Sequence, residues 1–160
     1  MLNNEPTRFK SNLKSLVGCL GDCLNVLNKH GKTDLTSIIT NGATAMIEED
    51  KDEVKFINTF IERSNDECWE MARIRNVDFF NNNSSILFGD MTNDYLINEV
   101  KKVILKNDKG EYIIGNELIN EAWEIIQTLI KISIKYLNKN PNIKVKIDTK
   151  KQIEAWKIKL

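Results

Sequence analysis

The fold is decided by the stretch Asn116–Leu137, NELINEAWEIIQTLIKISIKYL. Its apolar residues recur at intervals of three and four, the period of an α-helix, but they cover more than one face. They are Leu118, Ile119, Ala122, Trp123, Ile125, Ile126, Leu129, Ile130 and Ile134. A helix that is apolar on several sides is typical of the centre of a bundle. We therefore expect the other helices to surround this one, with Asn116 as its N-cap and Asn140-Pro141 as its end.

The same period predicts helices before this stretch. They cover residues 7–30, about 34–47, about 52–75, a short piece near 79–88, and about 93–105. Pro6 and Gly31 suit the start and the stop of the first of these helices. Asn76–Asp78 is expected to kink or restart the chain after the third. The sequence Asn107–Gly110 predicts a turn, and Tyr112–Ile114 a brief strand pairing.

The C-terminal residues change character. Ile143, Val145 and Ile147 alternate with polar residues, which is the pattern of a strand, and helical spacing returns after Thr149. We divide the chain into a helical bundle domain, residues 1–141, and a basic and apolar tail, residues 142–160. The predicted fold is all-α or nearly so: a compact bundle of about six helices with a short strand-like segment and a basic tail.

The net charge of the chain is zero, with 23 basic and 23 acidic residues. Non-specific binding of nucleic acid needs a surplus of positive charge, which the whole chain lacks. The charge is unevenly spread, because residues 139–160 hold seven lysines against Asp148 and Glu154. A basic tail on a neutral body indicates an acidic partner, or the acidic segment of the chain itself, residues 34–70, which holds ten acids and three bases.

The compartment is predicted from the cysteines and the apolar runs. Cys19, Cys23 and Cys68 are an odd number, so we expect free thiols in a reducing, intracellular compartment. The N-terminal residues lack the layout of a signal peptide. No apolar run approaches the ~18 residues of a membrane span.

No catalytic, cofactor or metal site is predicted. Cys19 and Cys23 can supply two metal ligands with Cys68 as a third, but His30 lies roughly 10 Å along the helix from Cys23, too far for a shared zinc ion. Small, half-buried thiols beside a leucine stripe explain the cysteines better. No phosphate loop, dinucleotide fingerprint or nucleophile elbow occurs. Lys106–Glu117 has the length of a calcium loop, but Lys106 occupies the position of the first ligand.

The tail is the candidate binding element. Its expected partner-facing residues combine positive charge with apolar side chains, and they are Lys150, Lys151, Ile153, Trp156, Lys157 and Leu160. Packing of the tail on its own domain is the alternative reading of the same residues. The functional reading is that the tail docks on a partner, either another protein or a second copy of the chain.

The segment from Phe79 to Tyr136 resembles a known group of proteins. The resemblance lies in Phe79-Phe80-Asn-Asn-Asn, in Ile86-Leu-Phe-Gly89, and in Trp123 followed by Leu129–Tyr136. These residues resemble small, uncharacterised helical proteins of the nucleocytoplasmic large DNA viruses, of the marseillevirus and mimivirus kind. The resemblance covers about a third of the chain and implies a protein of the host cytoplasm or the virion. The abundance of Ile, Asn and Lys, 60 of 160 residues, agrees with an A/T-rich genome.

Three functions follow from these observations. The first is a non-enzymatic helical interaction protein, a viral structural or accessory component associated with the virion. The second is a helical bundle that binds host peptides or regulators. The third is a protein that associates with nucleic acid through its basic tail. The sequence predicts no cofactor for any of them.

Overall fold

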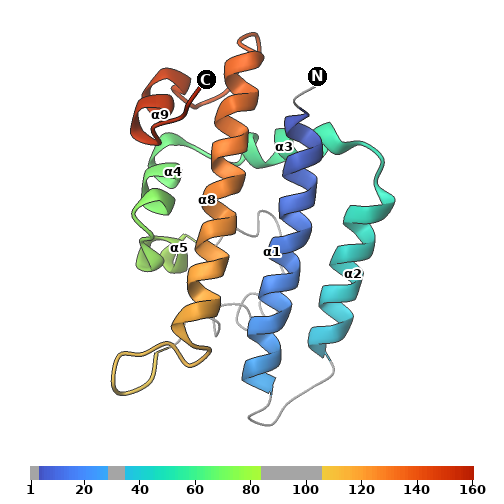
Figure 1. The fold of residues 1–160 in the computed structure, drawn as a ribbon, viewed down its shortest axis with the longest axis vertical. Coiled ribbons are helices and arrows are strands. Elements are labelled where there is room, and N and C mark those ends of the chain that lie inside the picture. The colour runs from blue at the N-terminus through green and yellow to red at the C-terminus, as the bar shows by residue number, and fades with distance from the viewer. Residues whose placement is uncertain (1–3, 29–34, 84–105) are drawn as a thin grey trace.

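A computed structural model describes residues 4–28, 35–83 and 106–160, and these residues form a bundle of α-helices (Figure 1). The helices are α1 (Glu5–Asn28), α2 (Leu35–Glu49), α3 (Glu53–Glu62), α4 (Asp66–Arg73), α5 (Val77–Asn82), α8 (Asn116–Lys139) and α9 (Thr149–Ala155). The predicted all-α bundle is confirmed. The helix expected over 93–105 and the residues Ile86–Gly89 lie outside the described part of the chain.

Helix α8 is the centre of the bundle, as its sequence predicts. It packs against α1, α4 and α9, and α1 runs beside it in the opposite direction (Figure 1). Its buried residues come from several sides of the helix, and they are Ile119, Leu129, Ile130, Ile132, Ser133, Ile134, Tyr136 and Leu137. The main core forms where these side chains meet Phe9, Ile57, Ile61 and Trp69.

The single helix expected over 52–75 is two helices, α3 and α4, separated at Arg63–Asn65. The Ser64 hydroxyl donates to the carbonyl of Phe60 at 2.7 Å. The Asn65 side chain accepts from the backbone N–H of Cys68, also at 2.7 Å, and so caps α4. Short polar side chains that bond nearby backbone groups favour helix ends over helix interiors, which explains the break. Asn76 caps α5 in the same way, so the predicted restart after Arg75 is confirmed.

The strand expected at Tyr112–Ile114 is reduced to one bridge between Lys106 and Tyr112. The turn at Asn107–Gly110 that closes it is present, and Gly110 takes the positive φ of 77° that such a turn favours. Helix α8 begins one residue earlier than expected, with Gly115 as its N-cap. The φ of Gly115 is 92°, a conformation that a residue with a β-carbon rarely adopts.

The strand-like segment Ile143–Ile147 forms no strand, which corrects the sequence prediction. Its alternation is real but has another cause. Ile143, Val145 and Ile147 pack against the main core, whereas Lys144 and Lys146 are exposed. An extended chain points successive side chains to opposite sides, and here one side is the bundle and the other is solvent.

The tail packs on its own bundle. Trp156 is 8% exposed and belongs to the same buried cluster as Ile57 and Leu129. The Asp66 carboxylate accepts from the Gln152 side-chain amide at 2.7 Å and from the backbone N–H of Asp148. Gln152 in turn accepts from the Trp156 indole N–H at 3.1 Å. The core therefore continues across the expected domain boundary between residues 141 and 142.

We predict that Trp156→Ala lowers the free energy of unfolding by about 3–5 kcal/mol, because it empties a buried space that the bundle cannot fill. Urea denaturation followed by circular dichroism measures this change. The control is Leu160→Ala, which truncates a side chain that is 79% exposed and should change the stability by less than about 0.5 kcal/mol. Equal stabilities for the two variants would contradict the packing of Trp156 in the core.

Candidate interaction surface

The residues predicted to bind a partner are divided between the core and the surface. Trp156 is buried and Ile153 is half-buried, so both hold α9 against the bundle rather than face outward. This corrects the expected orientation of Trp156, and its cause is the apolar surface that α8 offers to the tail. Lys150, Lys151, Lys157 and Leu160 are exposed. Whether they bind a partner stays a prediction.

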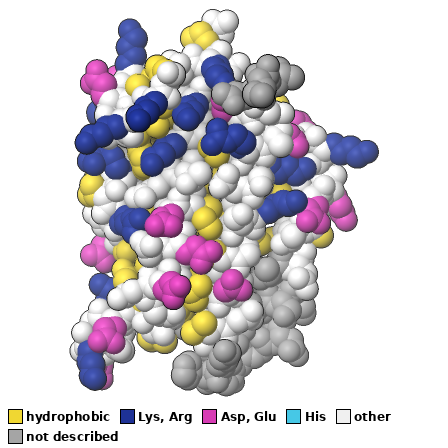
Figure 2. All heavy atoms as spheres, viewed as in Figure 1, with side chains coloured by type: hydrophobic (Ala, Val, Ile, Leu, Met, Phe, Trp, Pro, Cys, Tyr) yellow, Lys and Arg dark blue, Asp and Glu magenta, His cyan; other side chains and the backbone are white. Residues whose placement is uncertain are grey.

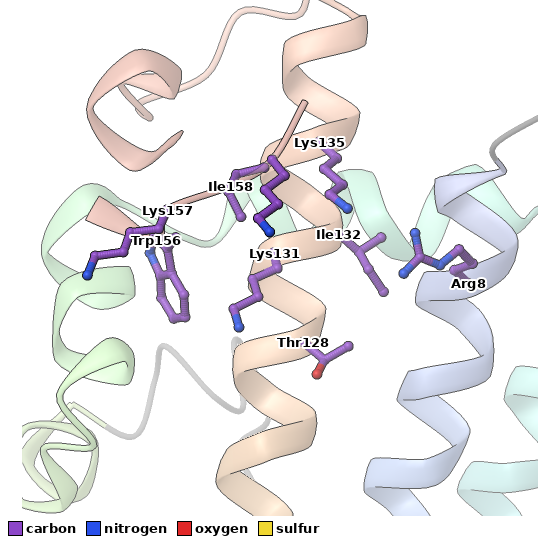
Figure 3. A pocket seen from close by; sticks show the side chains of 9 residues that line it. Arg8, Thr128, Lys131, Ile132, Lys135, Trp156, Lys157 and Ile158 are labelled. Carbon is purple, nitrogen blue, oxygen red and sulfur yellow. The ribbon is translucent and has the colours of Figure 1, made fainter. Parts of the chain in front are cut away.

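An open groove lies where the C-terminal residues cross α8 and approach the start of α1 (Figure 3). Its volume is about 300 Å³. We call it the basic groove, and its lining residues are Arg8 from α1, Thr128, Lys131, Ile132 and Lys135 from α8, and the run Trp156–Lys159. Five of these nine residues carry a positive charge.

The end of α9 brings the last lysines to the groove. The Ile158 N–H donates to the carbonyl of Ile153 at 3.0 Å, and the Lys157 N–H donates to that of Glu154 at 3.2 Å. This pair of bonds is the Schellman motif, in which glycine usually occupies the position of Lys157. Lys157 has a φ of 51°, a left-handed conformation that disfavours a side chain by roughly 1–2 kcal/mol. A strained lysine at the rim of a groove indicates a role beyond stability.

A partly buried ion pair lies on the other side of the groove. Lys139, at the end of α8, contacts the carboxylate of Glu5 at 2.6 Å, and the Glu5 side chain is only 4% exposed. This contact fixes the start of α1 against the end of α8. Arg8, one turn further along α1, then reaches toward Ile132 across the space between the two helices (Figure 3).

The charges of the basic groove are not neutralised by the part of the chain that the structure describes. Arg8, Lys131, Lys135, Lys157 and Lys159 form no ion pair with any described residue. The other predicted lysines differ in their surroundings. Lys151 lies near Glu70, whose pKa is lowered first by a hydrogen bond from Arg73 and then by both nearby cations. Lys151 therefore faces an acidic residue of α4 rather than the groove.

The acidic segment Glu48–Glu53 does not receive the tail. Glu48 pairs with Lys14 at 3.5 Å, and Asp50 pairs with Lys55 at 3.0 Å. Lys10 also donates to the backbone carbonyl of Asp50 at 2.7 Å. Glu48–Glu53 is thus bound by lysines of α1 and α3. The tail instead reaches the later part of the acidic segment 34–70, where Asp66 accepts from Gln152 and Lys151 lies near Glu70.

The sequence reasoning missed Arg8, Lys131 and Lys135 because it sought basic residues in the tail alone. Lys131 and Lys135 are four residues apart on a helix, so they lie on one face. They interrupt an otherwise apolar run, and that interruption is the signal for a polar face at this end of α8.

The cysteines are separated into two clusters. Cys19 and Cys23 pack with Ile114 and Ile119, whereas Cys68 lies in the main core. Among the described residues no three His, Cys, Asp or Glu side chains are close enough to hold a metal ion; His30 lies outside them. Burial raises the pKa of Cys23 to about 12 and that of Cys68 to about 11. These thiols stay protonated at neutral pH, and a protonated thiol is a poor nucleophile.

None of the described helices has the length and apolarity needed to cross a membrane.

We predict that the stability of the fold decreases above pH 9. The pKa of Cys23 is raised from 9.0 to about 12 on folding, so the folded state holds its proton where the unfolded state releases it. The free energy of unfolding is therefore highest below pH 9 and decreases toward pH 12. Urea denaturation at several pH values should show a shallower decrease for Cys23→Ala than for the wild-type chain. The same slope for both would contradict the assignment.

Comparison with protein-family models, with curated proteins and with solved structures gave no match. The function is therefore argued from the basic groove and the surface around it.

Proposed function

We propose that this chain is a non-enzymatic interaction protein that binds an acidic segment of a protein partner in its basic groove. The observation that carries the proposal is the gathering of five cations around one open groove, with no described acidic residue paired to any of them. Like charges repel, so a surface that holds them together stores electrostatic energy that a bound anion releases.

The lining of the groove favours a protein segment over a small inorganic anion. Ile158 contributes partly exposed apolar surface between the basic side chains, whereas Ile132 and Trp156 are almost completely buried. Binding grooves that combine apolar contacts with a few charged groups select a partner by both shape and charge. A peptide that alternates acidic and apolar residues fits this lining.

Nucleic acid is the rival partner, and the surroundings of the groove disfavour it. The outward residues at the other end of α8 are acidic: Glu117, Glu121 and Glu124 are all exposed. A nucleic acid long enough to extend from the groove along α8 would bring its phosphates against these carboxylates. A short acidic peptide would contact only the basic end of α8.

The remaining parts of the proposal rest on separate grounds. The high pKa of the buried thiols supports a non-enzymatic role for Cys23 and Cys68. A viral structural or accessory role is supported by the resemblance of Phe79–Tyr136 alone. The alternative of a bundle that binds host peptides differs in needing an apolar groove, whereas the groove here is lined mainly by charged residues.

The test is binding of a fluorescent polyglutamate peptide, measured by anisotropy at low salt. We predict that Arg8→Glu combined with Lys131→Glu raises the dissociation constant roughly tenfold or more, because two attractive charges become repulsive. Polyglutamate binding should also weaken with added salt.

The matched control combines Lys109→Glu with Lys144→Glu, two exposed lysines outside the groove. It changes the net charge by the same amount, so it should leave binding nearly unchanged if the groove is the site. Equal losses in both double variants would show that binding responds to net charge only. Tighter binding of a single-stranded oligonucleotide than of polyglutamate would favour the nucleic-acid alternative.

A further inference from the structure

The outward faces of α1 and α8 carry opposite charges at their two ends. Along α8 the outward residues follow the spacing of four and three, and they are Glu117, Glu121, Glu124, Thr128, Lys131 and Lys135. Residues at this spacing form one stripe on a helix. The stripe is acidic before Thr128 and basic after it.

Helix α1 repeats this arrangement in the opposite chain direction. Its exposed stripe is Arg8, Ser11, Ser15, Gly18 and Asp22. Arg8 lines the basic groove with Lys131 and Lys135. At the other end of the two helices, burial is the largest cause of the raised pKa of the Cys19 thiol. The carboxylates of Glu121 and Asp22 also raise this pKa, so both lie near Cys19. The two helices thus share a basic end and an acidic end.

The space-filling view shows this division on one face of the molecule. Most Lys and Arg side chains over α1 and α8 lie in the upper part of the face, and the Asp and Glu side chains lie below them (Figure 2). Between the charged ends the two stripes hold the small residues Ser15, Gly18 and Thr128. A β-carbon added to Gly18 would meet no atom within 4 Å, so this position is open.

The spacing of the charges is symmetric about the middle of each helix. Glu121 lies seven residues before Thr128 and Lys135 seven residues after it, which is about 10 Å in each direction. Arg8 and Asp22 stand in the same relation to Ser15. A twofold axis that runs across the two helices near their middles, perpendicular to both, lays each acidic end on the basic end of a second copy. An axis parallel to the helices would instead set like charges against each other.

We propose that the partner of this face is a second copy of the chain, bound antiparallel so that Glu121 of each copy meets Lys135 of the other. The proposal rests on the proposed function, because it names the acidic segment that occupies the basic groove. Small residues at the centre let the helix axes approach closely, and the paired charges at the ends fix the register.

The test is the mass of the full chain by analytical ultracentrifugation over a range of protein concentrations. We expect a monomer–dimer equilibrium at low salt that shifts to monomer near ~1 M salt, where charges are screened beyond ~3 Å. Lys135→Glu and Glu121→Lys should each raise the dimer dissociation constant roughly tenfold or more, since each reversal acts twice in a symmetric dimer. Circular dichroism on each variant reports that the helices persist.

The decisive sample is an equimolar mixture of these two variants. In the mixed dimer the lysine at position 121 of one chain meets the glutamate at position 135 of the other, and the second pair remains Lys135 with Glu121. We therefore expect the mixture to form dimers that neither variant forms alone. Lys109→Glu, outside the stripe, should dimerise like the wild-type chain.

A second variant acts without changing charge. Gly18→Gln fills the open centre of the face and replaces glycine by a better helix former, so the monomer should not lose stability. We expect it to weaken the dimer, and an unchanged dimer would place the interface elsewhere. A wild-type chain that stays monomeric, or a mixture that does not dimerise, overturns the proposal. If that monomer binds polyglutamate, the proposed function stands. If it binds neither polyglutamate nor a second copy, the proposed function and the dimer proposal are both wrong.

Discussion

The structure depends on the burial of α8 from several directions. Between Leu129 and Leu137 every residue is buried except Lys131 and Lys135. Such a helix must be covered by other elements, because each exposed apolar side chain would lose about 1.5–3 kcal/mol of burial energy. Helices α1, α4 and α9 supply this cover. The two lysines mark the only strip of this half of α8 that is left to solvent.

The basic groove follows from this constraint. The tail must close over α8 to bury Ile147 and Trp156, and the Asp66–Gln152–Trp156 bonds hold it in place. The chain then turns at Lys157 and sends its last residues along the exposed strip. The core therefore determines where the cations gather. The same elements that stabilise the bundle build the surface proposed to bind a partner.

The sequence predicted the helices well wherever the spacing of the apolar residues and the capping residues indicated the same helix bounds. The bounds of α1 and α8 differ from the prediction by two residues or fewer at each end, since long amphipathic runs leave little freedom. The prediction failed where local side-chain bonds overrode the period, as at Ser64 and Asn65. It also failed at Ile143–Ile147, because alternating apolar residues show only which side of an extended chain is buried. They do not show whether its backbone pairs with another strand. Trp156 was assigned to a partner because a sequence does not reveal whether an apolar tail folds back.

The net charge of zero hides an uneven distribution of charged residues along the chain. The balance of 23 basic and 23 acidic residues describes only the sum over the whole chain. It did not show that α8 separates Glu117, Glu121 and Glu124 from Lys131 and Lys135. That separation was available from the helical period, since these residues share one stripe and flank Thr128. A neutral protein whose acidic and basic residues are separated along a helix is attracted most strongly by a surface that presents the two charges in the reverse order. The same surface turned end for end satisfies that condition.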